Sequence, residues 1–387
     1  MTLRRVLTVF GTRPEAIKLA PVVKKLQSAP GFDSILCATG QHREMLDQVL
    51  RVFDIRPHYD LDIMQPNQDL SDVTVAALQG VKDVLQAVRP HLILVQGDTT
   101  TVMASSIAAY YHHIRVGHVE AGLRTNDKWQ PFPEEINRRL ASAVTDLHFA
   151  PTEWARQNLL RENIPSRQII VTGNPVIDAL QAVVRIPPTS AVLNLFKHIG
   201  IPYQPYVPHQ EHPSSSPRLI LVTAHRRENF GQPLEDICSA LNGSAGIYQD
   251  QIRIVYPVHL NPNVQEPVHR ILGRTPNITL LEPLDYLPMV HLMRHACLVL
   301  TDSGGLQEEA PSFGVPVLVM RRVSERPEGI QAGTVRLVGT DPAEILTQAR
   351  LLLDNPQAYG AMAQAINPYG DGEAARRIVE AILQASS

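Results

Sequence analysis

Short apolar runs alternate along this chain with longer segments whose apolar residues recur every three or four positions. Residues 6–10 (VLTVF) and 91–96 (HLILVQ) are runs of the first kind. Residues 15–27 are of the second kind, because apolar residues recur every three positions from Ile17 to Leu26. Buried strands that alternate with amphipathic helices are typical of a parallel sheet covered by helices on both faces. The pattern therefore predicts an α/β fold.

The alternation extends over almost the whole chain and divides into two series. The first predicts strands at 6–10, 35–38, 91–96, 114–119, 147–150 and 169–171, with helices at 15–27, 43–53, 72–88, 100–111, 133–143 and 152–161. The second predicts strands at 219–223, 252–257, 278–281, 298–301 and 317–320, with helices at 233–242, 263–272, 284–295, 306–312 and 373–384. Residues 186–217, rich in Pro, His and Ser, predict a connection with an exposed loop. We therefore expect two doubly wound sheets in tandem.

Composition and charge narrow the class of protein. Of the 387 residues, 44% are hydrophobic and 19% are charged, which is the balance of a globular protein with two domains. The formal net charge is −3, from 35 basic and 38 acidic residues. Such a chain lacks the large positive field of a nucleic-acid-binding protein. A basic pocket for phosphate must then be local.

The cysteines and the first residues predict a cytoplasmic protein without a membrane segment. Cys37, Cys238 and Cys297 are far apart and form no CxxC, which argues against a disulfide framework or a zinc site and favours buried core residues. The apolar run 6–10 is too short for a signal peptide, and charged residues follow it at once. No stretch approaches the length needed to span a bilayer.

Charged residues follow the predicted strands of the first half, at the sheet edge where doubly wound folds bind ligands. After the first strand, Arg13 and Lys18 can face a phosphate near the start of a helix, or lie on its surface. After 91–96, Asp98 is either a carboxylate at the mouth of the sheet or a helix cap. Both interpretations of each segment stay open at this point.

Further carboxylates follow the next predicted elements. Glu120 ends an apolar strand, where a carboxylate is costly to bury unless it is used chemically or paired, with Arg124 as a candidate partner. Glu134 and the residue after it open the helix 133–143, where acids also complement the helix dipole. The residues 137–139 that follow (Asn-Arg-Arg) are compatible with a solvated helix face.

The second half carries features suited to a diphosphate. His225 follows the strand 219–223, where chemistry would occur, although a lone histidine is more often structural. After 298–301, Gly304 and Gly305 let the backbone approach a ligand at a helix start, and Glu309 can bind a ribose hydroxyl. Neither a Walker A motif nor G-x-G-x-x-G is present, which argues against ATPase and NAD-dehydrogenase functions. Phosphate-binding features in one half and carboxylates in the other predict a nucleotide-sugar site between two domains.

The same segments, as an ordered set, resemble the non-hydrolysing UDP-N-acetylglucosamine 2-epimerases. The resemblance runs almost end to end, and the Pro/His/Ser-rich segment 197–217 is the clearest departure from it. The motifs that carry it are GTRPEAIKLAP (11–21), GQHREMLDQVL (40–50), GDTTT (97–101), GHVEAGLRT (117–125), PFPEEINRRL (131–140), TGNPVIDAL (172–180), TAHRREN (223–229), YPVHLNPNV (256–264), TDSGGLQEEAPS (301–312), SERPE (324–328), AGTVRLVGTD (332–341) and NPYGDG (367–372).

The resemblance implies a fold and an assembly. The fold is glycosyltransferase-B-like, with two Rossmann-like domains that face a cleft, one over residues 1–175 and a UDP-binding one over 176–365. The last helix, within 366–387, is expected to return to the first domain. The resemblance also implies a cytoplasmic homodimer that needs no cofactor and no metal, with UDP-N-acetylglucosamine and UDP-N-acetylmannosamine as ligands, and a supply of N-acetylmannosamine units for cell-surface polysaccharide.

The resemblance also assigns roles to residues of this chain. The catalytic candidates are Asp98, Glu120, Glu134 and His225. Arg13 and Lys18 would meet the phosphates, while Ser303, Gly304, Gly305 and Glu309 would hold the diphosphate and ribose, with Arg326 nearby. Gln41 and His42 match part of a second, regulatory substrate site, although segment 65–71 lacks the basic residue expected there.

The chemistry of C2 inversion constrains the mechanism. The C2 proton is not adjacent to a carbonyl group, so we expect elimination of UDP to an unsaturated 2-acetamidoglucal, followed by re-addition. This route needs a base and an acid on opposite ring faces, for which Asp98 and Glu120 are favoured with help from Glu134, and cations for the diphosphate. Three alternatives stay open: a hydrolysing epimerase, a glycosyltransferase of the same architecture, and a non-catalytic nucleotide-sugar sensor.

Overall fold

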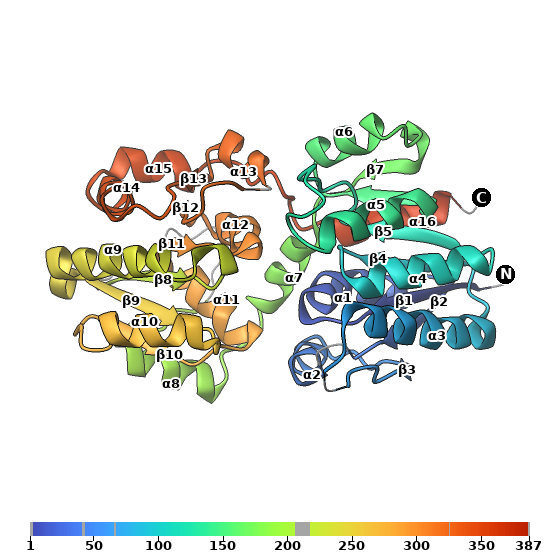
Figure 1. Ribbon diagram of the computed structural model, residues 1–387, viewed down its shortest axis with the longest axis horizontal. Helices are drawn as coiled ribbons and strands as arrows, with labels where there is room; N and C mark the ends of the chain where they lie inside the picture. Colours follow the sequence, from blue (N-terminus) through green and yellow to red (C-terminus); the bar gives the residue numbers. More distant parts are fainter. Residues whose placement is uncertain (1–2, 41–42, 66, 206–216, 325, 386–387) are drawn as a thin grey trace. The chain divides into compact units, whose positions relative to one another are not determined.

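The computed structural model describes the chain except for residues 1–2, 41–42, 66, 206–216, 325 and 386–387. The chain forms two compact units. One consists of Met1–Gln181 together with Tyr369–Ser387, and the other of Ala182–Pro368. Each unit is a parallel sheet with helices on both faces (Figure 1). The predicted α/β class with two doubly wound sheets is confirmed.

The first sheet has seven strands in the order β3-β2-β1-β4-β5-β6-β7. Its strands are β1 (Arg4–Phe10), β2 (Phe32–Ala38), β3 (Tyr59–Asp60), β4 (Leu92–Gln96), β5 (Arg115–Val119), β6 (Leu147–Ala150) and β7 (Ile169–Val171). Every pairing between them is parallel. The central strand β4 is buried over its whole length, which explains its uninterrupted apolar sequence.

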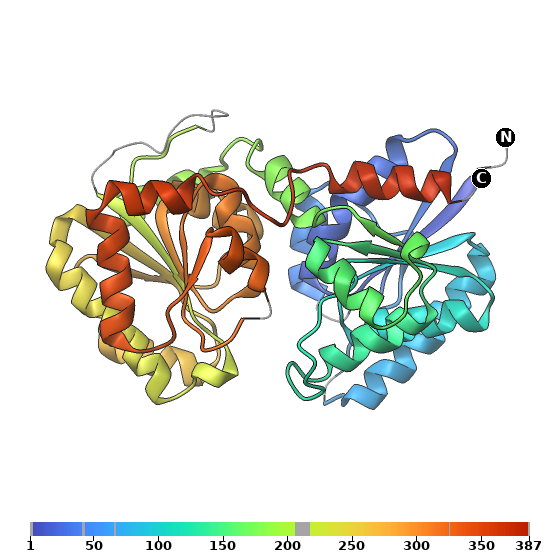
Figure 2. The same ribbon diagram turned by 90° about the horizontal axis from the view of Figure 1, so that it is seen from above.

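The helices of the first unit include the last helix of the chain. They are α1 (Arg13–Ser28), α2 (Arg43–Val52), α3 (Leu70–Val88), α4 (Thr100–Tyr111), α5 (Glu134–Val144), α6 (Glu153–Arg161), α7 (Pro175–Val183, which runs into the second unit), α16 (Ala374–Gln384) and the short 3-10 turn Ser166–Gln168. Helix α16 packs on α1, and both views place it with this unit (Figure 2). Its last carbonyl groups accept hydrogen bonds from Arg4 (2.8 Å to Leu383 O) and Arg115 (3.1 Å to Ala385 O).

The second sheet has six strands in the order β10-β9-β8-β11-β12-β13. These are β8 (Arg218–Thr223), β9 (Ile252–Pro257), β10 (Ile278–Leu281), β11 (Ala296–Thr301), β12 (Val317–Val319) and β13 (Val335–Leu337). The helices are α8 (Ser190–Ile199), α9 (Gln232–Tyr248), α10 (Pro262–Leu272), α11 (Tyr286–His295), α12 (Gly304–Glu309), α13 (Pro327–Ala332), α14 (Pro342–Asp354) and α15 (Pro356–Ala363), with 3-10 turns at Arg227–Asn229, Gln249–Gln251 and Ala310–Phe313.

Helix α8 corrects one sequence-based prediction. The segment 186–217 was expected to be a connection with an exposed loop, but its first part is helical. Thr189 caps this helix, the side chains of Val192, Phe196 and Ile199 are buried on one face, and Gly200 ends it in the left-handed conformation. The apolar spacing was therefore present, although the neighbouring prolines and histidines obscured it. The rest of the predicted loop lies mostly outside the described residues.

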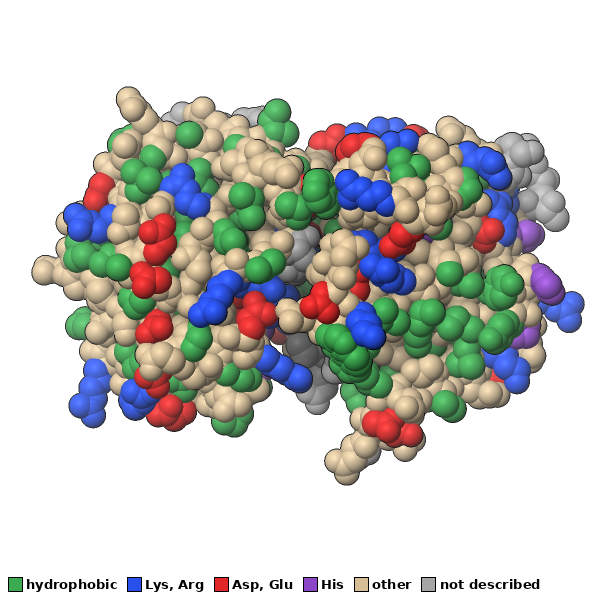
Figure 3. All heavy atoms as spheres, turned by 45° about the horizontal axis from the view of Figure 1, so that its top comes forward, with side chains coloured by type: hydrophobic (Ala, Val, Ile, Leu, Met, Phe, Trp, Pro, Cys, Tyr) green, Lys and Arg blue, Asp and Glu red, His purple; other side chains and the backbone are tan. Residues whose placement is uncertain are grey.

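The surface and the helix lengths bear on the class of protein. On the face seen in Figure 3, acidic and basic side chains are interspersed between small apolar groups. Among the helices that the structure describes, none combines the length and the apolar character that a membrane crossing would require.

Candidate active site

The buried side chain of Glu15 joins two loops at the carboxyl edge of the first sheet. Its Oε2 accepts hydrogen bonds from the backbone N–H groups of Gly11 (2.6 Å) and Thr12 (2.7 Å), and its Oε1 accepts one from the Thr99 hydroxyl. Burial raises the pKa of Glu15, and these donors act in the opposite direction. Glu15 was not predicted as a site residue, although its spacing from Thr12 is that of a capping box.

Glu120, predicted to be catalytic, lies in a buried polar cluster directly after β5. Its backbone is in the left-handed region (φ +64°) and only 7% of the residue is exposed. Its Oε1 accepts from Lys18 Nζ (2.5 Å) and Asn174 Nδ2 (2.9 Å), and its Oε2 accepts from Gln96 Nε2. A cation and two amide donors thus surround this buried carboxyl group.

The ion pairs differ from the expected ones. Arg124, a candidate partner of Glu120, instead binds Glu162 through Nε and Nη2, both at 2.8 Å. Because Glu162 ends α6, this pair fixes the loop after β5 to that helix. Lys18, predicted to meet phosphates, contacts Glu120 in its place.

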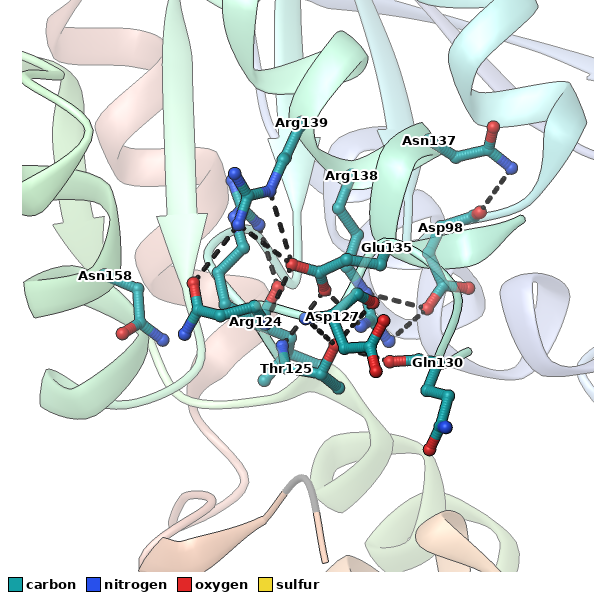
Figure 4. Close-up of polar contacts among 12 residues, drawn as sticks. Asp98, Arg124, Thr125, Asp127, Gln130, Glu135, Asn137, Arg138, Arg139 and Asn158 are labelled. Atoms are coloured by element: carbon teal, nitrogen blue, oxygen red, sulfur yellow. Dashed lines mark hydrogen bonds and ion pairs between the residues drawn. The ribbon is translucent and has the colours of Figure 1, made fainter. Parts of the chain in front are cut away.

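Asp98 follows β4 and is held by two residues of α5. Arg138 donates to Asp98 Oδ2 from Nε (3.0 Å) and from Nη2 (2.6 Å), and Asn137 Nδ2 donates to the Asp98 backbone oxygen at 3.0 Å (Figure 4). The Asp98 side chain is 28% exposed, so its carboxylate is accessible as well as paired. Asn137 and Arg138 are buried, which corrects the interpretation of these two as part of a solvated face, whereas Arg139 is exposed as that interpretation expects. The capping role that the segment also suggested, for Asp98 or Thr99, falls to Thr99, whose side chain caps α4.

The two glutamates that open α5 have different environments. Glu135 is fully buried and accepts from the backbone N–H groups of Thr125 (3.0 Å) and Asn126 (3.2 Å) and from Arg139 (3.3 Å) (Figure 4). It therefore holds the loop before α5. Glu134, the catalytic candidate, is half-buried at the first position of the helix.

The adjacency of β4 and β5 places Asp98 and Glu120 on neighbouring strand ends. The two strands pair from Leu92 with Arg115 to Gln96 with Val119. Gly97, at φ +83°, turns the chain beside the carboxylate, since a Cβ built on it would stand 3.8 Å from Glu120 Oε2. The first unit thus has two carboxylates side by side, each with its own cation.

In the second unit, the buried carboxylate of Asp302 organises the loop that carries His225. Asp302 Oδ2 accepts from the backbone N–H groups of His225 and Arg226, both at 2.8 Å, and from Asn229 Nδ2 at 3.1 Å. Asp302 Oδ1 lies 3.5 Å from His225 Nδ1. The His225 ring also stacks on that of His259, with centroids 5.5 Å apart. The sequence placed His225 at the strand end, but did not identify Asp302 as the group that orients it.

The glycine turn after β11 packs closely against Arg326. Ser303 precedes α12, which begins with Gly304 and Gly305. A Cβ on Gly304 would collide with the Arg326 guanidinium, so no larger residue fits there without a shift. Arg326 is buried and its Nε bonds to Glu308 Oε1 at 2.5 Å.

The remaining predicted residues of both units are also placed. Glu309 is buried and accepts from the Tyr286 hydroxyl at 3.5 Å. Arg13 is half-buried as the first residue of α1. Gln41 and His42, the predicted regulatory residues, lie outside the described residues. In the described part of the chain, no group of three or more His, Cys, Asp or Glu side chains is arranged to hold a metal ion.

The arrangement of the two sheets shows the fold class of this protein. Two Rossmann-like units in one chain, with polar residues at the strand ends of both, form a glycosyltransferase-B-like fold. A glycosyltransferase structure from Rickettsia africae matches the whole chain with a TM-score of 0.64 at 12% identity, a likeness of fold alone.

Sequence comparison then gives the family. Residues 24–383 match the family described as UDP-N-acetylglucosamine 2-epimerase. A UDP-N-acetylglucosamine 2-epimerase of Salmonella typhimurium is 55% identical over 378 residues, which is 98% of each chain. The structure of the UDP-GlcNAc 2-epimerase from Neisseria meningitidis bound to UDP-GlcNAc has a TM-score of 0.88 at 47% identity and covers 98% of this chain and 100% of that one. The chain belongs to the UDP-N-acetylglucosamine 2-epimerase family.

Proposed function

We propose that this protein interconverts UDP-N-acetylglucosamine and UDP-N-acetylmannosamine by inversion at C2, without hydrolysis. The observation that carries the proposal is the pair of carboxylates at the ends of adjacent strands, Asp98 bound by Arg138 and Glu120 bound by Lys18. Membership of the 2-epimerase family supports the substrate and the reacting carbon. Bound UDP-GlcNAc in the Neisseria meningitidis relative supports a nucleotide-sugar site.

The proposed reaction begins with an elimination. A carboxylate takes the C2 proton, the C–H electrons form a double bond between C1 and C2, and the C1–O bond breaks so that UDP leaves with its electron pair. The reverse steps add UDP at C1 and a proton at C2 from the opposite ring face. Atoms and charge balance without an oxidant or reductant.

The acid and base roles follow from the geometry of the first unit. One of Asp98 and Glu120 takes the C2 proton as the base, and the other carries a proton that it returns to C2 from the opposite ring face; Arg138 and Lys18 hold the two carboxyl groups in place. Inversion requires one of them to act on each ring face, with half-buried Glu134 as a nearby third carboxyl group. General acid–base groups of this kind contribute about 10²–10⁴-fold to a rate.

The second unit supplies the binding groups in this proposal. The backbone N–H groups of Gly304 and Gly305 and the hydroxyl of Ser303 hold the diphosphate, and Glu309 binds a ribose hydroxyl. His225, Arg326 and Arg13 offset the negative charge that develops on the departing UDP.

The decisive experiment follows UDP-GlcNAc in D₂O by proton NMR, with no added cofactor. We expect UDP-N-acetylmannosamine carrying deuterium at C2, and Asp98→Asn should lower the initial rate about 10²–10⁴-fold. Asp33→Asn is the matched control, since Asp33 forms a surface ion pair with Arg5 in the same unit. Free N-acetylmannosamine with UDP would replace the proposal by a hydrolysing epimerase. An unchanged sugar with folded protein would favour a glycosyltransferase or a sensor.

The proposal extends to the assembly and the use of the product. We propose a cytoplasmic homodimer that supplies N-acetylmannosamine units for cell-surface polysaccharide, as the family resemblance implies. Analytical ultracentrifugation of the purified protein tests the dimer, and a monomer at all concentrations would contradict it. Loss of N-acetylmannosamine from the polysaccharide of a deletion strain tests the supply.

A further inference from the structure

Asn174 connects the Glu120 carboxylate to the place where the chain passes between its two units. It lies between β7 and α7, is 1% exposed, and donates from Nδ2 to Glu120 Oε1 at 2.9 Å. Its Oδ1 accepts from the backbone N–H of Val176 at 3.1 Å. Because Oδ1 is used in this way, the amide has one orientation, with its donor toward the carboxylate.

The backbone of Asn174 is bound to the returning chain. Its N–H donates to Tyr369 O at 2.7 Å, and Tyr369 is the first residue of the first unit after the chain leaves the second. Gly173 and Gly370 pack back to back, since a Cβ on Gly173 would stand 3.4 Å from Gly370 Cα. The outgoing and returning segments are thus joined at Asn174 without intervening side chains.

A second set of contacts braces the same junction. Asp178 of α7 accepts from the backbone N–H groups of Ala374 (3.2 Å) and Ala375 (2.8 Å) at the start of α16. Arg377 donates to Thr172 O at 3.1 Å. The junction is therefore rigid within the first unit, and a group attached to it has a fixed position.

We propose that Asn174 is a positioning residue that fixes the Glu120 carboxylate on this junction of the two connecting segments. The inference rests on the proposed function for its kinetic consequence. Asn174 has no reacting proton to offer, so it acts through Glu120. Gln96 fixes the other carboxylate oxygen, but it belongs to β4 and has no link to the connecting segments.

The electrostatic surroundings make substitution at this position informative. The charged and titratable groups near Glu120 are Lys18 of α1, Asp98 after β4 with its partner Arg138 of α5, and His118 of β5. Asn174, like Gln96, is a neutral amide donor to this carboxylate. An aspartate there keeps the size of the side chain but replaces a donor with a negative charge, which disfavours ionisation of Glu120.

The test compares Asn174→Ala, Asn174→Asp and Gln181→Ala. Gln181 also contacts the returning chain, at Asp371 O (3.2 Å), and serves as the control because none of its bonds reaches Glu120. We expect Asn174→Ala to lower kcat about 10²-fold with KM changed by less than about 3-fold, as a displaced reacting group does. Asn174→Asp should in addition move the acid limb of the kcat–pH profile to higher pH, because it places a negative charge beside the carboxylate. Gln181→Ala should retain the kcat and profile of the wild type.

A measurement independent of turnover separates the two proposals. In protein labelled with ¹³C at glutamate carboxyls, the Glu120 signal is assigned with Glu120→Gln and titrated in the wild type and in Asn174→Asp. A higher titration midpoint in Asn174→Asp supports the inference, even if the wild type does not epimerise and the proposed function fails. An unchanged midpoint, or wild-type kcat in both Asn174 variants, overturns it and reduces Asn174 to the cap of α7.

Discussion

Arg138 donates two hydrogen bonds to Asp98 from one guanidinium group, from Nε at 3.0 Å and from Nη2 at 2.6 Å, and Oδ2 accepts both. Oδ1 is then the oxygen that can take a proton in the proposed reaction. The arrangement fixes both the position and the rotation of the carboxylate. A planar fork can do this, whereas a point charge cannot.

Replacing Arg138 by lysine should therefore impair the reaction more than binding. We expect kcat for epimerisation to fall about 10–10²-fold with little change in KM, because an ammonium group retains the charge and loses the fixed geometry. Steady-state rates from the NMR assay measure this. Arg139→Lys is the control on the same helix, since Arg139 contacts Glu135 and Asn126 and not Asp98. Equal losses in both variants would show that the effect belongs to α5 as a whole.

Replacing Asp302 by asparagine should weaken nucleotide binding. Asp302 Oδ2 accepts three hydrogen bonds from N–H groups of the loop that carries His225. If the NH₂ group of an asparagine replaces this oxygen, it cannot accept these bonds. We expect Kd for UDP to rise about 10-fold or more, as the loss of hydrogen bonds to a buried charged group implies. Isothermal titration calorimetry measures the change. Asp285→Asn, on the exposed start of α11, should bind UDP like the wild type.

Mild acid should destabilise the fold through its buried histidines. Burial lowers the pKa of His118, His148, His291 and His295 to about 4 each. An unfolded histidine takes up its proton near pH 6.5, so between pH 6.5 and pH 4 the unfolded state binds more protons and stability falls as the pH falls. Each such histidine should remove about 2 kcal/mol at pH 5 relative to pH 7.

The histidine prediction is checked by urea unfolding of the wild type and His291→Phe at both pH values. His291 is buried and contacts Tyr203 at 3.2 Å, far along the chain from the residues proposed for catalysis. The variant should lose less stability between pH 7 and pH 5 than the wild type. If the two pH dependences coincide, His291 already carries a proton in the folded protein.

Asp178 should contribute with the opposite sign over nearly the same range. Burial is the main cause that raises its pKa from an ordinary 3.8 to about 6. Between these values the folded state binds more protons, so the contribution of Asp178 to stability falls as the pH rises from about 4 to about 6 and is constant above. The unfolding free energy of the wild type should therefore fall relative to that of Asp178→Asn as the pH rises over that interval. A difference that is independent of pH would contradict the raised pKa.

The sequence predicted the parts of the fold that local patterns determine. Buried strands such as Leu92–Gln96 have an unmistakable apolar pattern, and the strand-end rule then locates Asp98, Glu120 and His225. The two-residue strand Tyr59–Asp60 carries too short a pattern to detect. Helix α8 was missed because its flanking prolines and histidines outweighed its apolar spacing.

The partners of the site residues could not be predicted in the same way. Glu120 meets Lys18 across 102 positions and Asn174 across 54. Such pairs depend on which loops the sheet order brings together. Arg124, four residues from Glu120, was the natural guess from local spacing, but it binds Glu162 instead. Neighbours in sequence after a strand end point in different directions, so proximity along the chain misleads there.

The return of α16 to the first unit has a consequence for biosynthesis. The first unit holds Met1–Gln181 but also Tyr369–Ser387, so the second is an insertion within it. A ribosome releases all of the inserted unit before it makes the last helix of the outer one. The inserted unit can therefore fold while translation continues. During this time the surface of α1 that α16 later covers is exposed to solvent. We therefore expect the second unit to complete its fold before the first, because the α1 surface is covered only after α16 has been made.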